Sequence, residues 1–257
     1  MDLYNIYLFD RKLRTIVFEA VTNVEINFKA YLSDTISAKY GVRDSDYLKR
    51  ENFREDDESL NDYPYSSLKE HIKKNISKQI KNNHPSIVWY KKNYNYFPFW
   101  VVANILTIGD ASRIYGKMKE EDRIVVAKNY LLPYDTLSSY IIHINLIRNV
   151  CAHNDILYRY RNTNSIPKKI KRVKEIYENI CIPINKVTGR YERGTNDFLA
   201  TIIVLKLLLS SDDFNLFKTQ FNGLMHQTQK KLANTTFELI IKEMGLDDNW
   251  KDTMNKI

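Results

Sequence analysis

Glycine and proline are scarce in this chain, which has seven of the first and six of the second among 257 residues. These two residues mark tight turns and interrupt helices, so their scarcity argues against a fold of many short strands joined by turns. Apolar residues recur three and four positions apart, which is the helical period. We therefore expect an all-α fold, in a single domain that covers residues 1–257.

Cysteine and long apolar runs are also nearly absent. Cys151 and Cys181 are the only cysteines, and neither belongs to a CxxC or CxxH pair. This argues against a disulfide framework or a structural zinc site and is typical of a reducing compartment. The longest apolar runs, 100–109 and 198–209, are shorter than the roughly 20 residues that a membrane span needs. No secretory leader opens the chain, so we expect a cytoplasmic protein with no membrane partner.

Positive charge exceeds negative charge. Lysine and arginine total 39, aspartate and glutamate total 31, and the net charge is +8 with a pI near 9.2. This balance predicts an anionic partner. Nucleic acid is the commonest partner of this kind, and a membrane surface or an acidic protein fits the same charge.

The helical period predicts four main helical regions. A long amphipathic helix covers 3–40 and ends at Gly41, and a lysine-rich helical stretch covers 66–92, with Pro85 interrupting it. A third helix is expected at about 137–158. The C-terminal helices are expected at about 196–231, beginning at Asn196 or Asp197. Shorter helices are expected between these regions: one that follows Pro98 and ends at Gly109, one capped by Asp110 or Ser112, and one over 122–130.

The helix at 137–158 contains the most informative motif, RNVCAH. It places Arg148 and His153 five residues apart, with Asn145, Asn149 and Asn154 around them. Arginine is a permanently charged fork that binds phosphate, and histidine exchanges a proton near neutral pH. No carboxylate cluster accompanies them. The pair suits cleavage of RNA without a metal or other cofactor, because the 2′-hydroxyl of RNA can serve as the nucleophile.

Helical geometry limits how this pair can act. At about 100° per residue, Arg148 and His153 lie roughly 140° apart around an ideal helix. Asn145, Asn149 and His153 share one face instead, because each is four residues after the last. Three arrangements would bring the pair together: a long reach of the arginine side chain, a start or bend of the helix here, or two copies facing each other in a dimer. The non-catalytic alternative is a structural histidine beside an arginine in a surface ion pair.

The motif resembles the R-x4-6-H motif of HEPN domains. The chain as a whole resembles the Abi-like (abortive infection, AbiD/AbiF-type) proteins of bacteria, and four stretches carry this resemblance in order: LYNIYLFDRKLRTIVFEAVTNVEINFKAYLSDTISAKYG, FPFWVVANILTIGDASRIYGKM, LIRNVCAHNDILYRYRN and FLATIIVLKLLL. The resemblance implies a HEPN-like helical bundle with additional helices. It also implies a role in defence against phage, often as a toxic component that cuts RNA.

The same resemblance assigns roles to residues. It implies that Arg148 and His153 are the catalytic pair, with Asn149 beside them. Glu25 and Lys29 stand where the family carries a glutamate and usually an arginine, which implies a supporting role. The alternative is a salt bridge between residues four apart on one helix, worth a few tenths of a kcal/mol.

A basic segment leads out of the motif helix. Residues 159–174 contain seven basic residues and no acid, and Tyr158 and Tyr160 alternate with arginines, which suits stacking on unpaired bases. The alternative is a solvated basic surface. The predicted RNA contacts are Asn145, Asn154, Tyr158, Arg159, Arg161, Lys168, Lys169, Lys171 and Arg172. The lysine-rich stretch at 69–92 is a second candidate track for RNA.

Together these patterns predict a metal-independent endoribonuclease of the abortive infection or toxin–antitoxin type, with RNA as substrate. A homodimer is expected, and an antitoxin, either a protein or a small RNA, is a further expected partner. Two alternatives remain. One is a non-catalytic RNA-binding or regulatory module that uses the same pair to grip a phosphate. The other is a protein-interaction scaffold in which the motif only joins helices.

Overall fold

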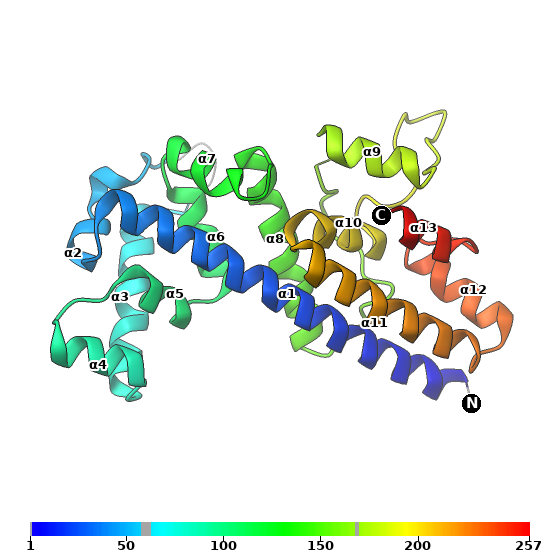
Figure 1. Cartoon of the computed structure of the whole chain (residues 1–257), viewed down its shortest axis with the longest axis horizontal. Coiled ribbons are helices and arrows are strands. Elements are labelled where there is room, and N and C mark those ends of the chain that lie inside the picture. Colours follow the sequence, from blue (N-terminus) through cyan, green and yellow to red (C-terminus); the bar gives the residue numbers. More distant parts are fainter. Residues whose placement is uncertain (1, 58–62, 168–169) are drawn as a thin grey trace. The chain divides into compact units, whose positions relative to one another are not determined.

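The computed structural model describes residues 2–57, 63–167 and 170–257 (Figure 1). These residues form thirteen α-helices and no β-strand, which confirms the all-α prediction. Across the described residues, no helix is both long enough and apolar enough to cross a bilayer.

The chain divides into two compact units. The first unit combines the residues up to Val24 with His143–Ile257, and the second unit is Glu25–Ile142. Two long helices, α1 (Asp2–Tyr40) and α8 (Tyr134–Ala152), contribute to both units. The single domain over residues 1–257 stays a prediction.

The first unit is built around the buried helix α10 (Phe198–Leu208). Ten of its eleven residues are buried, which explains why its sequence is apolar on every side. Asp197 caps it by accepting a hydrogen bond from the Ala200 amide at 3.0 Å, so the predicted start is confirmed. The other helices of this unit beyond α1 and α8 are α9 (Lys171–Asn179), α11 (Ser211–Gln229), α12 (Asn234–Glu243) and α13 (Trp250–Lys256).

Figure 1 shows the N-terminal half of α1, in blue, running beside α11, in orange. Two hydrogen bonds join them, from Asn23 to Asp213 and from Gln220 to Glu19. Helices α10 and α11 together account for the region predicted at 196–231. Helices α9, α12 and α13 were not predicted.

The second unit contains shorter helices around the C-terminal half of α1. They are α2 (Asp44–Tyr47), α3 (Tyr65–Lys81), α4 (Pro85–Asn93), α5 (Phe99–Ile105), α6 (Ile108–Lys117) and α7 (Glu120–Lys128). Helix α1 ends before Gly41, whose φ of +82° suits glycine, as predicted. Pro85 occupies the first position of α4, where its missing N–H costs no helical hydrogen bond, and this confirms the predicted interruption.

The predicted boundary at Gly109 is wrong, as are the predicted caps Asp110 and Ser112. Helix α5 ends at Ile105 and Thr107 caps α6. The Thr107 hydroxyl accepts from the Asp110 amide at 3.1 Å, and the Asp110 carboxylate accepts from the Thr107 amide at 3.0 Å. This reciprocal capping box starts the new helix at Ile108, one residue before the glycine that was expected to end the old one.

Helix α8 begins and ends earlier than the predicted 137–158. It begins at Tyr134, directly after Pro133, and ends at Ala152. Asn154 adopts a φ of +61°, and the Asp155 amide donates to the Val150 carbonyl at 3.2 Å. A left-handed residue followed by this hydrogen bond is the Schellman ending of a helix. The residues after His153 therefore leave the helix.

His143 joins α8 to its neighbours in the first unit and is almost wholly buried. Its Nδ1 accepts from the side-chain Nδ2 of Asn162 at 3.1 Å, so Nε2 carries the hydrogen and donates to the Thr201 hydroxyl at 3.0 Å. Asn162 in turn donates its backbone N–H to the Asn196 carbonyl at 2.8 Å. Burial lowers the pKa of His143 to about 4, so the imidazole is neutral at physiological pH.

This burial predicts a pH-dependent stability. Below pH 6.5 the histidine takes up a proton in the unfolded chain, whereas in the folded chain it stays neutral down to about pH 4. Its contribution to the free energy of unfolding is therefore complete above about pH 6.5 and falls by up to about 3 kcal/mol as the pH drops to 4. Urea denaturation of the wild type and of His143→Gln at several pH values should show the wild type losing more stability on acidification. Parallel curves for the two proteins would contradict this assignment.

Candidate catalytic site

Arg148 lies in the last two turns of α8 and is half-buried. Its guanidinium stands over the ring of Phe18 on α1, 5.8 Å from the ring centroid, which is a cation–π distance. Phe18 exposes 38% of its surface, so this contact is at the edge of solvent. Among the described residues no acid forms an ion pair with Arg148. The alternative in which this arginine belongs to a surface ion pair therefore finds no support there.

His153 is exposed and stands one residue after the end of α8. Its backbone N–H donates to the Asn149 carbonyl at 2.9 Å, so helical hydrogen bonding continues as far as the histidine. The offset of roughly 140° between Arg148 and His153 therefore applies. No hydrogen bond between these two side chains occurs in the described part of the chain. Asn145 and Asn149, both half-buried, lie on the same helical face as the histidine.

The segment that follows His153 is held by a buried ion pair on α1. Arg14 donates from Nη1 to the Asp155 carbonyl at 2.8 Å. Asp10 accepts from the backbone amides of Leu157 and Tyr158 at 2.9 and 3.1 Å. The two side chains are 3.2 Å apart, one helical turn from each other. We call Asp10 and Arg14 the clamp.

The clamp is buried as well as paired. Asp10 exposes 5% of its surface and Arg14 exposes 8%. Burial raises the pKa of Asp10, while the two backbone hydrogen bonds and Arg14 act in the opposite direction. Loss of one partner from such a pair leaves an uncompensated buried charge, which is strongly destabilising. The clamp therefore fixes where the chain goes immediately after the motif.

The predicted RNA contacts beyond the motif are distributed along an irregular segment and α9. Tyr158 is half-buried with its ring 6.2 Å from that of Phe9, and Arg159 is exposed. Arg161 pairs with Glu243 at 3.6 Å, and Lys171 pairs with Glu175 at 3.7 Å, so acids offset part of the positive charge. The remaining predicted contacts are exposed Asn154 and half-buried Arg172, together with Lys168 and Lys169, which lie outside the described residues.

Glu25 and Lys29 belong to the second unit. The Lys29 ammonium lies 2.6 Å from the Glu25 carboxylate and donates a second hydrogen bond to the Leu106 carbonyl. The salt bridge proposed as the alternative is thus present. A supporting role for these residues in the site stays a prediction.

Other chemistry near the motif is limited. Burial raises the pKa of the Cys151 thiol to about 12, so it is protonated and a poor nucleophile at neutral pH. Both cysteines are free. Within the described ranges, no three histidine, cysteine, aspartate or glutamate side chains form a group that would hold a metal ion.

The sequence patterns did not single out the residues that position the motif. The clamp has a recognisable signal, because Asp10 and Arg14 are an acid and a base four residues apart, beside the buried positions Phe9, Leu13 and Val17. His143 also has one, since it follows the buried Ile141 closely on a helix that is otherwise apolar on its core side. The residues that these side chains contact lie far away in the chain and carry no such signal in the sequence.

Removal of the clamp should loosen the motif's exit segment. Asp10→Ala takes away the acceptor of two amides and leaves Arg14 buried without its acid, so we expect a loss of about 3 kcal/mol in the free energy of unfolding. Relative to the wild type, hydrogen exchange should then accelerate more at the Leu157 and Tyr158 amides than at the amides of α10. Arg11→Ala, at an exposed position of the same helix, is the matched control. An Asp10→Ala protein as stable as this control would show that the clamp is not structural.

Comparison with known proteins bears on this whole arrangement. The family model described as Abi-like protein matches residues 1–159, which include the clamp and the motif. No curated protein and no solved structure matches the chain. The matched residues are more than half of the sequence, and the family suggests a role in abortive-infection defence. By this match, the chain belongs to the Abi-like protein family.

Proposed function

We propose that this protein is an endoribonuclease of the HEPN type that acts in abortive-infection defence against phage. The observation that carries the proposal is an exposed His153 at the clamped end of α8, with Arg148 in the preceding turn and without an acidic partner among the described residues. Family membership supports the defence role. The chemistry is proposed from the two side chains themselves.

The histidine supplies proton transfer. His153 takes the proton from a ribose 2′-hydroxyl, and the 2′-oxygen forms a bond to phosphorus while the bond from phosphorus to the 5′-oxygen breaks. The leaving 5′-oxygen takes a proton from a protonated imidazole. Products then carry 2′,3′-cyclic phosphate and 5′-hydroxyl ends, and no bound metal or cofactor is needed for any of these steps.

The arginine supplies charge. Arg148 binds the two non-bridging oxygens of the scissile phosphate and stabilises the negative charge that grows on them. The ring of Phe18 limits the freedom of its guanidinium, so the side chain loses less conformational entropy when it binds a phosphate. Asn149, between the pair in sequence, orients the substrate or the imidazole.

The 140° offset favours two copies over one. In a single chain Arg148 is turned toward Phe18 on α1, whereas half-buried Asn149 and exposed His153 lie on another face of the helix. A symmetric dimer would place the His153 of one copy against the Arg148 of the other and so build two composite sites. In each, a single imidazole acts as base toward the 2′-hydroxyl and, once protonated, as acid toward the 5′-oxygen. An antitoxin, either protein or RNA, would restrain the enzyme by binding over the active site at this dimer interface.

Cleavage of mixed cellular RNA in EDTA tests the proposal. The wild type should cut RNA and leave cyclic phosphates, whereas His153→Ala should be slower by about 100-fold or more. Arg148→Lys keeps the charge but loses the planar fork, and we expect a smaller loss, of about tenfold. Product ends are mapped by their reactivity to ligases and phosphatases.

The control is His226→Ala, which removes an exposed histidine from α11 in the same unit. It should cleave at the wild-type rate, and His153→Ala should unfold at the wild-type temperature because the side chain is exposed. Full activity of His153→Ala would overturn the assignment. RNA that is bound by the wild type and left intact would favour the non-catalytic binding module.

A further inference from the structure

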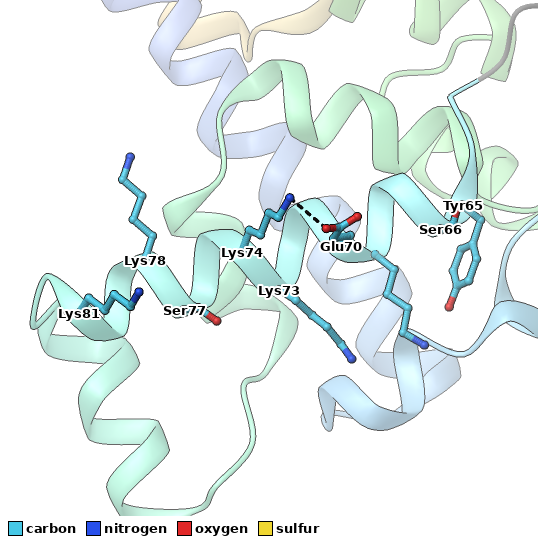
Figure 2. A pocket seen from close by; sticks show the side chains of 9 residues that line it. Tyr65, Ser66, Glu70, Lys73, Lys74, Ser77, Lys78 and Lys81 are labelled. Carbon is cyan, nitrogen blue, oxygen red and sulfur yellow. Dashed lines mark ion pairs between the residues drawn. The ribbon is translucent and has the colours of Figure 1, made fainter.

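Helix α3, in the second unit, has one buried side and one strongly basic side. Leu68, Ile72 and Ile76 are buried. The other side forms an open groove of about 700 Å³, whose basic residues are Lys69, Lys73, Lys74, Lys78 and Lys81. Figure 2 labels four of these lysines, and their side chains are distributed along the helix toward the end with Lys81: Lys73, Lys74, Lys78 and Lys81.

The groove holds little negative charge to offset these lysines. Glu70 is its acidic residue, and it pairs with Lys74 at 2.9 Å. Lys73, Lys78 and Lys81 are exposed. These lysines are five and three residues apart, which is about 7.5 and 4.5 Å along the helix axis. Flexible lysines at this spacing can reach successive phosphates of one strand.

Helix α4 and the residues directly after it carry a cluster of aromatic rings, two of which are exposed. Trp89 stands 4.9 Å from Tyr90 and 5.4 Å from Tyr94, and Tyr94 stands 5.7 Å from Tyr96, all between ring centroids. Trp89 exposes 52% of its surface and Tyr94 exposes 51%. Lys91 and Lys92 are exposed beside them. A cluster of large rings open to solvent marks a binding surface, because each ring keeps apolar area in water.

The two features lie on neighbouring helices, because α3 and α4 pack against each other. We propose that this helical pair binds an unpaired polynucleotide strand, with phosphates on the lysines of α3 and bases stacked on Trp89 and Tyr94. A basic groove joined to stacking rings is how proteins bind single strands without sequence preference. A duplex would offer the phosphates but would hide the faces of its bases. An anionic membrane surface also attracts lysines and takes up exposed tryptophan and tyrosine rings, so binding to anionic vesicles is the competing outcome that the experiment has to separate.

This surface is independent of the proposed ribonuclease. It uses neither Arg148 nor His153, and the groups it recognises are common to RNA and DNA. The experiment therefore uses the full-length chain carrying His153→Ala, which keeps RNA probes intact. If this variant did not bind the strand, the cleavage proposal would still stand. If the wild type did not cleave RNA, the binding proposal would still stand.

Fluorescence anisotropy with labelled oligouridylate tests the lysines. Changing Lys73, Lys78 and Lys81 together to Glu should weaken binding at least tenfold and lower the slope of log affinity against log salt by about 2, which is three lost contacts at about 0.7 each. The matched control changes Lys128, Lys230 and Lys242 to Glu, which alters the net charge equally at exposed positions elsewhere. An equal loss in both triple variants would overturn the proposal.

Alanine at Trp89 and Tyr94 tests the rings. This double variant should bind oligouridylate roughly tenfold more weakly with an unchanged salt slope, because stacking releases no counterions. Oligothymidylate should bind as oligouridylate does, and a duplex of the same length more weakly. Tighter binding of the duplex would overturn the proposal. So would lysine-dependent binding to phosphatidylserine vesicles without binding to either strand.

Discussion

The buried ion pair between Asp10 and Arg14 is the interaction on which the motif region depends. Each side chain holds backbone of the segment after His153, and the hydrogen bond from Arg14 joins residues 141 positions apart in sequence. Burying two charges costs desolvation energy, and here that cost is offset by their mutual attraction and by three hydrogen bonds to backbone. The exit of the chain from α8 is therefore fixed by α1, the first helix of the protein.

A second set of buried hydrogen bonds fixes α8 at His143. Neutral His143 joins this helix to Thr201 on α10 and to Asn162, which lies beyond the clamped segment. The chain after His153 is thus fixed at residues 155–158 by the clamp and at Asn162 by His143, while His153 itself remains exposed. This combination suits catalysis, since a reacting side chain gains from a rigid base and needs access to its substrate. The absence of an ion pair at Arg148 among the described residues is consistent with a side chain kept for an external anion.

The elements that follow from local patterns were predictable, and those set by distant contacts were not. The apolar period of α1 with Gly41 behind it, Pro85 at the start of α4 and Asp197 before α10 all predicted the observed boundaries. The end of α8 was placed too late, because the apolar period continues through Leu157, which is buried off the helix rather than on it. Arg148 and His153 were found from their chemistry and from the family resemblance. Asp10, Arg14 and Asn162 position the motif, and only the fold reveals their partners.

The most direct test of a shared site between two copies is complementation between two inactive variants. His153→Ala and Arg148→Ala chains, co-expressed with different tags, yield a heterodimer that can be purified through both tags. If each site takes Arg148 from one copy and His153 from the other, this heterodimer has one complete site and should cleave RNA at about half the wild-type rate per dimer. A heterodimer as inactive as its two parents would show that the pair does not act across a dimer seam.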